Sequence, residues 1–78
     1  MNYLEDIIYK DEERQFLITR VKDKEYLIVV YGSVGTYLVG KELDKNQLDE
    51  FWKDKSSIIP MVQRLEYDYA SEGGFRVD

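Results

Sequence analysis

The distribution of hydrophobic residues in the first half of the chain predicts β-strands. Apolar, β-branched and aromatic residues are concentrated at Phe16–Val21 and again at Tyr26–Tyr31, and the charged residues 22–25 separate the two runs. Short runs of this composition joined by a polar turn are typical of antiparallel hairpins. The second run is apolar on both alternating faces, so we predict a central strand, covered on one side and partly on the other.

Two weaker patterns flank this hairpin. Residues 5–10 fit either a strand or a single helical turn, because Asn2 followed by Glu5 resembles a capping box; we favour the strand. The glycine-containing segment 32–35 breaks the apolar pattern, and Thr36–Val39 resumes it as a further strand. Together these segments predict an antiparallel β-meander.

The middle of the chain predicts an amphipathic helix over residues 45–55. Asp44 and Gln47 have the spacing of a capping box, in which two side chains three residues apart each satisfy a free backbone amide. The apolar face of this helix comprises Leu48, Phe51 and Trp52. We expect Trp52 to be the side chain that anchors the helix on the sheet.

The C-terminal third permits two interpretations. In the first, Ser56 or Ser57 caps a helix with Pro60 in its first turn, where a missing amide costs little. The apolar stripe of that helix comprises Ile58, Met61, Val62, Leu65 and Tyr69. In the second, residues 65–69 and 75–77 alternate as the two strands of a terminal hairpin. We favour the helix.

These elements predict one small α+β domain spanning residues 1–78. Its architecture is a three- to four-stranded antiparallel β-meander followed by one or two C-terminal helices packed on one face. The chain is 44% hydrophobic and 14% aromatic, which is far richer in apolar side chains than disordered segments are. Seven tyrosines, three phenylalanines and one tryptophan exceed what one small core can hide, so we expect some aromatic surface to be exposed.

The chemistry available to the chain is limited, because it contains no histidine and no cysteine. These residues supply most proton shuttles, covalent nucleophiles and transition-metal ligands, so we predict no enzyme, no cofactor and no metal site. Residues 35–42 match the glycine and lysine positions of a phosphate-binding P-loop. Glu42, however, stands where a hydroxyl should bind magnesium, and we interpret Gly40 as the end of a strand.

Charge and hydropathy narrow the range of partners. Sixteen acidic and eleven basic residues give a net charge of -5, which opposes the phosphate backbone, so we expect no direct nucleic-acid binding. The longest apolar run, residues 27–31, is far shorter than the ~20 residues of a membrane span, and the N-terminal residues do not resemble a secretory signal. Without cysteine for disulfides, we expect cytoplasmic localisation.

A cluster of tyrosine and acidic residues near the C-terminus points most directly to function. Tyrosine is enriched in the hot spots of protein interfaces, and acids beside it steer the protein towards a basic surface. The predicted contact surface comprises Glu66, Tyr67, Asp68 and Glu72. Its negative field is extended by Asp49, Glu50 and Asp54.

The leading hypothesis is therefore a small acidic protein-binding module that blocks or regulates a basic protein partner. In physical type it compares with bacterial immunity proteins and phage anti-defence proteins. The alternative is a structural protein that assembles as a homodimer or larger homo-oligomer by pairing edge strands or burying surplus aromatic surface. A third hypothesis, a small enzyme or ligand-binding domain, requires a pocket and a carboxylate that titrates above its usual range.

Overall fold

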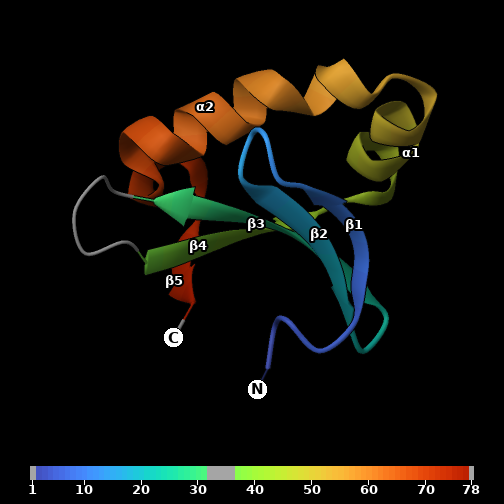
Figure 1. Cartoon of the computed structure of the whole chain (residues 1–78), viewed down its shortest axis with the longest axis horizontal. Helices are drawn as coiled ribbons and strands as arrows, with labels where there is room; N and C mark the ends of the chain where they lie inside the picture. Colours follow the sequence, from blue (N-terminus) through green and yellow to red (C-terminus); the bar gives the residue numbers. More distant parts are fainter. Residues whose placement is uncertain (1, 32–36, 78) are drawn as a thin grey trace.

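The computed structural model describes residues 2–31 and 37–77, and within them five strands form one antiparallel sheet in the order β1-β2-β3-β4-β5 (Figure 1). The strands are β1 (Ile7–Asp11), β2 (Phe16–Val21), β3 (Lys24–Tyr31), β4 (Tyr37–Leu43) and β5 (Phe75–Val77). The helices are α1 (Lys45–Lys53) and α2 (Ile59–Asp68), each followed by a short 3-10 helix, η1 (Lys55–Ile58) and η2 (Ala70–Glu72).

The architecture confirms the predicted α+β class, with the helices lying across one face of an antiparallel sheet (Figure 1). The sheet has one strand more than predicted. This strand, β5, comes after both helices and pairs antiparallel with β4, so that Leu38 lies opposite Val77. The helical segment between β4 and β5 therefore covers the sheet and then returns the chain to its edge.

The main core lies between the sheet and the helices. Its buried side chains come from alternate strand positions and from the inner faces of the helical segments: Phe16, Ile18, Leu27, Val29, Val39, Leu43, Phe51, Ile58, Val62 and Leu65. β3 is the middle strand of the sheet, as predicted. Leu27 and Val29 point into this core, whereas Ile28 is buried on the opposite face.

A second, smaller apolar cluster lies on the other face of the sheet. The Tyr3 ring of the N-terminal segment sits 5.0 Å from the ring of Tyr26 and 5.2 Å from that of Phe75. Gly40 lies beneath this cluster, because a Cβ atom there would be 3.1 Å from the side chains of Ile28, Phe75 and Val77. The expectation that Gly40 ends its strand is thus wrong: it lies inside β4, where a missing side chain lets Phe75 approach.

The N-terminal segments differ from the sequence-based expectation only in detail. β1 confirms the strand interpretation, and the Asn2 side chain accepts a hydrogen bond from the amide of Leu4 instead of capping a helix. The β2–β3 turn is shorter than the predicted residues 22–25, because Val21 already pairs with Lys24. Lys22 adopts a φ of 51° in that turn. The predicted break at residues 32–35 and its neighbour Thr36 lie outside the described residues.

The helices follow the predicted periodicity, but only α1 begins with the predicted cap. The capping box of α1 is confirmed, since Asp44 Oδ1 accepts from the Gln47 amide at 2.8 Å and Gln47 Oε1 accepts from the Asp44 amide at 2.9 Å. α1 ends at Lys53, two residues early, because Asp54 begins η1 by accepting from the amide of Ser56 at 3.1 Å. The predicted serine cap of α2 is wrong, since Ile58 occupies its N-cap position without a side-chain hydrogen bond.

Helix α2 confirms the favoured interpretation of the C-terminal third. Ile58, Val62 and Leu65 are buried, and Met61 and Tyr69 are partly buried against the same core. The terminal-hairpin interpretation is wrong for residues 65–69. The strand that this interpretation predicts at residues 75–77 is confirmed, but its partner is β4.

Candidate functional site

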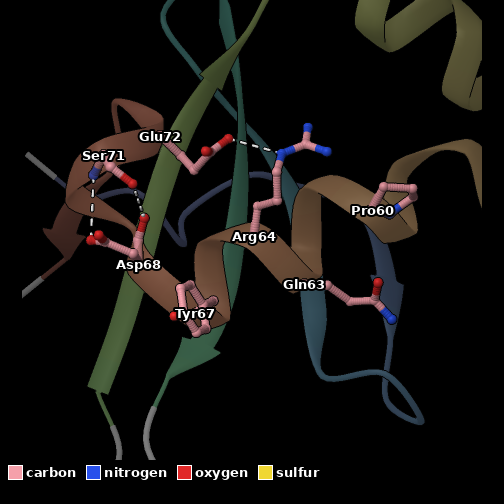
Figure 2. Close-up of a pocket in the computed structure, with 7 residues that line it drawn as sticks. All are labelled: Pro60, Gln63, Arg64, Tyr67, Asp68, Ser71 and Glu72. Atoms are coloured by element: carbon pink, nitrogen blue, oxygen red, sulfur yellow. Dashed lines mark hydrogen bonds and ion pairs between the residues drawn. The ribbon is translucent and has the colours of Figure 1, made fainter.

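A shallow groove of about 580 Å³ runs along the outer face of α2 and is closed at one end by η2 (Figure 2). Helical periodicity produces it, because Val62 and Leu65 turn towards the sheet and leave the positions between them facing outwards. The residues that line the groove are Pro60, Gln63, Arg64, Tyr67, Asp68, Ser71 and Glu72. Three of the four residues of the predicted contact surface are among them.

Tyr67 is the most exposed large hydrophobic side chain in the described part of the molecule, at 86%. It lies in the last turn of α2. Within residues 2–31 and 37–77, no other ring and no cation contacts its ring. The side chain therefore contributes little to folding, although it presents a large apolar and aromatic area to the surroundings.

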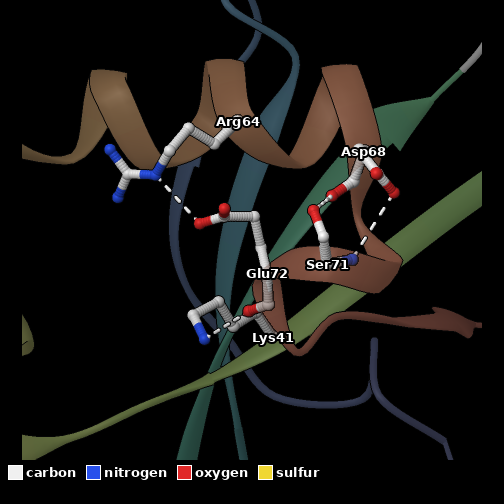
Figure 3. A network of polar contacts seen from close by, with 5 residues as sticks. All are labelled: Lys41, Arg64, Asp68, Ser71 and Glu72. Carbon is white, nitrogen blue, oxygen red and sulfur yellow. Dashed lines mark hydrogen bonds and ion pairs between the residues drawn. The ribbon is translucent and has the colours of Figure 1, made fainter.

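Asp68 ends α2 and holds the turn that follows. Its Oδ1 atom accepts a hydrogen bond from the Ser71 amide at 3.4 Å, and its backbone carbonyl accepts from the Ser71 hydroxyl at 3.1 Å. These bonds turn η2 back alongside the helix (Figure 3). The carboxylate makes no ion pair in the described part of the chain, so its charge is free to act on a partner.

Glu72 is bound to neighbouring side chains of the protein, whereas the sequence predicts an exposed contact residue. Arg64 Nε donates to Glu72 Oε1 at 2.9 Å, and Lys41 Nζ donates to the Glu72 backbone carbonyl at 2.7 Å (Figure 3). Glu72 thus links η2 to α2 on one side and to β4 on the other. Its charge is largely offset by Arg64, and its side chain is only 29% exposed.

Arg64 is the charged groove residue that the predicted contact surface does not include. It lies three and four positions before Tyr67 and Asp68, which is the spacing of neighbours on a helix surface, so the helical pattern could have found it. The fourth predicted residue, Glu66, is exposed but does not line the groove. With Arg64 and Glu72 paired, Glu66 and Asp68 carry the remaining negative charge of this region.

The acids of α1 form a separate group. Asp49, Glu50 and Asp54 line a shallow depression of about 490 Å³ together with Asn46 and Lys53. α1 and the C-terminal end of α2 lie at opposite ends of the helical layer (Figure 1). The seven predicted residues therefore form two acidic regions and not one continuous surface. Asp54 also has a structural role, because its side chain caps η1.

Trp52 does not anchor α1 on the sheet, which corrects the sequence-based expectation. Phe51 is fully buried at 0% exposure, whereas Trp52 is 43% exposed. The indole packs at the border of the core, with its ring centroid 6.0 Å from that of Tyr9 and the Lys55 ammonium 5.0 Å above it. Two adjacent helix positions point about 100° apart, so only one of them faces the sheet centre.

The P-loop-like segment and the acidic clusters of the sequence can be placed on the fold where their residues are described. Gly40 and Lys41 of the P-loop-like segment lie within β4, while Gly35 and Thr36 lie outside the described residues. No group of three or more acidic residues is placed to hold a metal ion in residues 2–31 and 37–77. The pKa of Arg20 is raised by its hydrogen bond to Glu25 and by the negative charge of that carboxylate. The two residues face each other on β2 and β3 and do not line the groove.

The fold and the site define a small α+β domain with helices on one face of an antiparallel sheet and a tyrosine-bearing groove on the outer helix. No protein-family model, curated protein or solved structure matches the chain significantly. Among the described residues, no helix has the length and apolar character needed to cross a bilayer.

Proposed function

We propose that the chain is a stoichiometric protein-binding module, not a catalyst, which blocks or regulates a basic protein partner through the outer face of α2. The observation that carries this proposal is Tyr67, a large aromatic side chain that is 86% exposed in a groove whose unpaired charge is negative. Such side chains are characteristic of interface hot spots. The lack of cysteine in the sequence supports a reducing compartment such as the cytoplasm.

The charge of the whole chain supports the same partner chemistry. A net charge of -5 raises the rate of encounter with a basic protein and disfavours acidic ones. The acids of α1, which include Asp49 and Glu50, contribute to this long-range attraction without lining the groove. Asp68 acts at short range, because it lies in the groove beside Tyr67.

The experiment is affinity capture from lysate of the source organism with immobilised wild-type protein and with the Tyr67→Ala variant, at low and high ionic strength. We expect wild type to retain a basic protein at low ionic strength and to release it at high. The affinity of Tyr67→Ala for that protein should be at least about tenfold weaker, which is the effect of a hot-spot truncation. Binding of the purified pair by titration calorimetry gives the value.

The matched control is Asn46→Ala, which changes an exposed, uncharged side chain on α1, outside the groove. It should keep the wild-type affinity, and the thermal midpoints of both variants should stay close to that of wild type. For Asp68, the substitution Asp68→Asn is preferable to alanine because the amide oxygen still accepts from Ser71. Wild-type affinity of Tyr67→Ala for the captured protein would overturn the site assignment.

A second candidate function, self-assembly, is favoured by one observation on the other face of the sheet. A depression of about 270 Å³ lies there, floored by Leu17, Ile28, Val30 and Leu38. Burying such a surface would stabilise a homo-oligomer. Sedimentation over a concentration series distinguishes the two functions, because a wild-type dimer that becomes monomeric in Leu38→Asp supports assembly, and a wild-type monomer at every concentration excludes it.

A further inference from the structure

Two aromatic rings elsewhere in the described part of the chain, one exposed and one partly buried, lie under cations of the same chain. The Arg76 guanidinium carbon lies 4.2 Å from the centre of the Tyr37 ring, and the Lys55 ammonium lies 5.0 Å from that of Trp52. Both distances are within the range of a favourable cation–π interaction. The Tyr67 ring has no cation over it among the described residues, although it is the most exposed of the three.

The same groove provides a carboxylate for a cation that would bind there. Arg64 and Glu72 neutralise each other through their 2.9 Å contact. Within the described ranges Asp68 forms no ion pair, and its bond to the Ser71 amide is long, at 3.4 Å, so the carboxylate retains capacity for a stronger donor. An uncovered aromatic ring and a carboxylate without an ion pair among the described residues thus line the same groove, which makes this groove complementary to a positive charge.

We propose that the groove recognises an arginine side chain of the partner protein, whose guanidinium stacks on Tyr67 and donates hydrogen bonds to Asp68. This inference rests on the proposed function and specifies the chemistry of the partner. Arginine fits better than lysine, because a planar guanidinium can lie flat on a ring and still direct N–H groups sideways to a carboxylate. A lysine ammonium is a compact, strongly hydrated charge without such a plane. The Arg76–Tyr37 contact is the intramolecular counterpart of the stacking.

The probe is a short blocked glycine–arginine peptide, with the glycine–lysine peptide of equal charge as its comparison. Each is titrated into isotopically labelled protein, and binding is followed by NMR at the Tyr67 ring and the Asp68 amide. We expect the arginine peptide to bind about two- to fivefold more tightly, which is the size of a cation–π interaction at an exposed site. The shifts should be largest at these two residues.

Two variants separate stacking from charge. Tyr67→Leu keeps apolar area but removes the aromatic face, and should abolish the preference for arginine. Asp68→Asn should weaken both peptides. The control Glu50→Gln removes one charge from the α1 group and should leave the preference unchanged. Because Tyr67 and Glu50 are exposed, folding should be unaffected, and thermal midpoints verify this.

Equal affinity for the two peptides, no measurable binding of either, or shifts centred on the α1 acids would each overturn the inference. The proposed function is judged separately by affinity capture. A captured partner that depends on Tyr67, combined with equal peptide affinities, would leave the protein-binding function standing and remove its arginine specificity.

Discussion

Thr19 combines complete burial with an unsatisfied polar group. Its side chain is 0% exposed, and its hydroxyl is the buried side-chain oxygen without a hydrogen-bond partner in the described part of the chain. The residue lies within β2, opposite Ile7 of β1 and Tyr26 of β3. A hydroxyl that leaves water without gaining a partner destabilises the folded state.

Replacing this hydroxyl with a methyl group should therefore stabilise the protein. For Thr19→Val we expect the free energy of unfolding to rise by about 1 kcal/mol, because the buried desolvation penalty is removed and the shape is kept. Chemical denaturation measures the change. The control Thr19→Ser keeps the hydroxyl and loses the methyl group, so it should be less stable than wild type. A loss of stability in Thr19→Val would contradict the unsatisfied state of the hydroxyl.

Single residues also show where sequence reasoning reached its limit. The helix face that contains Phe51 and Trp52 was predicted correctly, since periodicity is local. Which of the two enters the core depends on the angle at which α1 meets the sheet, and that angle is not encoded in the spacing. The larger ring was expected inside, but the smaller one fits there and Trp52 lies at the border.

At the scale of elements, Asp54 joins two helical segments. Its amide donates to the Glu50 carbonyl and so ends α1, while its carboxylate accepts from the amide and hydroxyl of Ser56 and so begins η1. The sequence pattern predicts for Asp54 only a contribution to the negative field. The serine that was expected to cap the next helix is instead a donor to this aspartate.

A substitution that removes the cap should be distinguishable from one that removes only the charge. We expect Asp54→Ala to lower the free energy of unfolding by about 0.5–2 kcal/mol, as losses of N-cap side chains do. Asp54→Asn keeps an accepting oxygen and should stay within about 0.5 kcal/mol of wild type. Thermal unfolding compares the two. Similar losses in both variants would show that the charge, and not the cap, is what matters.

The separation of paired strands along the sequence determined which strand pairs could be predicted. β1 to β4 are consecutive in chain and in sheet, so alternation and turns were sufficient to place them. β5 is a three-residue strand whose partner lies before both helices. Its alternation was visible, but nothing local specifies a partner more than thirty residues away, and the short pattern was assigned to a hairpin.

At the scale of the whole molecule, the two faces of the sheet are covered differently. The helices bury one face, whereas the other carries the smaller cluster and the Tyr3 ring of the N-terminal segment. The backbone carbonyl of Asp6 accepts from the Arg20 amide at 2.9 Å and holds this segment against β2. A chain of 78 residues has a small free energy of unfolding, so we expect this partial covering to contribute a substantial share of it.

Tyr3→Ala tests how much this covering contributes. We expect a loss of about 1–3 kcal/mol in the free energy of unfolding, because the ring contacts of Tyr26 and Phe75 are removed together with buried apolar area. The control Glu5→Ala changes an exposed side chain of the same segment and should have little effect. Denaturant titration measures both. Wild-type stability in Tyr3→Ala would show that the segment does not support the sheet.

The sequence predicted the types of residue in the candidate site better than their arrangement in space. Tyr67 and Asp68 were identified because exposed aromatic and acidic residues stand side by side in the sequence, and the structure places both in one groove. The pairing of Arg64 with Glu72 and the separation of the α1 acids depend on how η2 folds back and how the helices cross the sheet. Neither of these two features can be read from the order of residues in the sequence.

The position of the single tryptophan also provides an optical signal for folding that arises far from the groove. Trp52 lies on α1, which is at the opposite end of the helical layer from the groove (Figure 1). Its fluorescence reports the contact of α1 with Tyr9, and this contact is lost when the chain unfolds. A single sample can therefore be followed by indole emission for its folded fraction while a ligand is added to the groove.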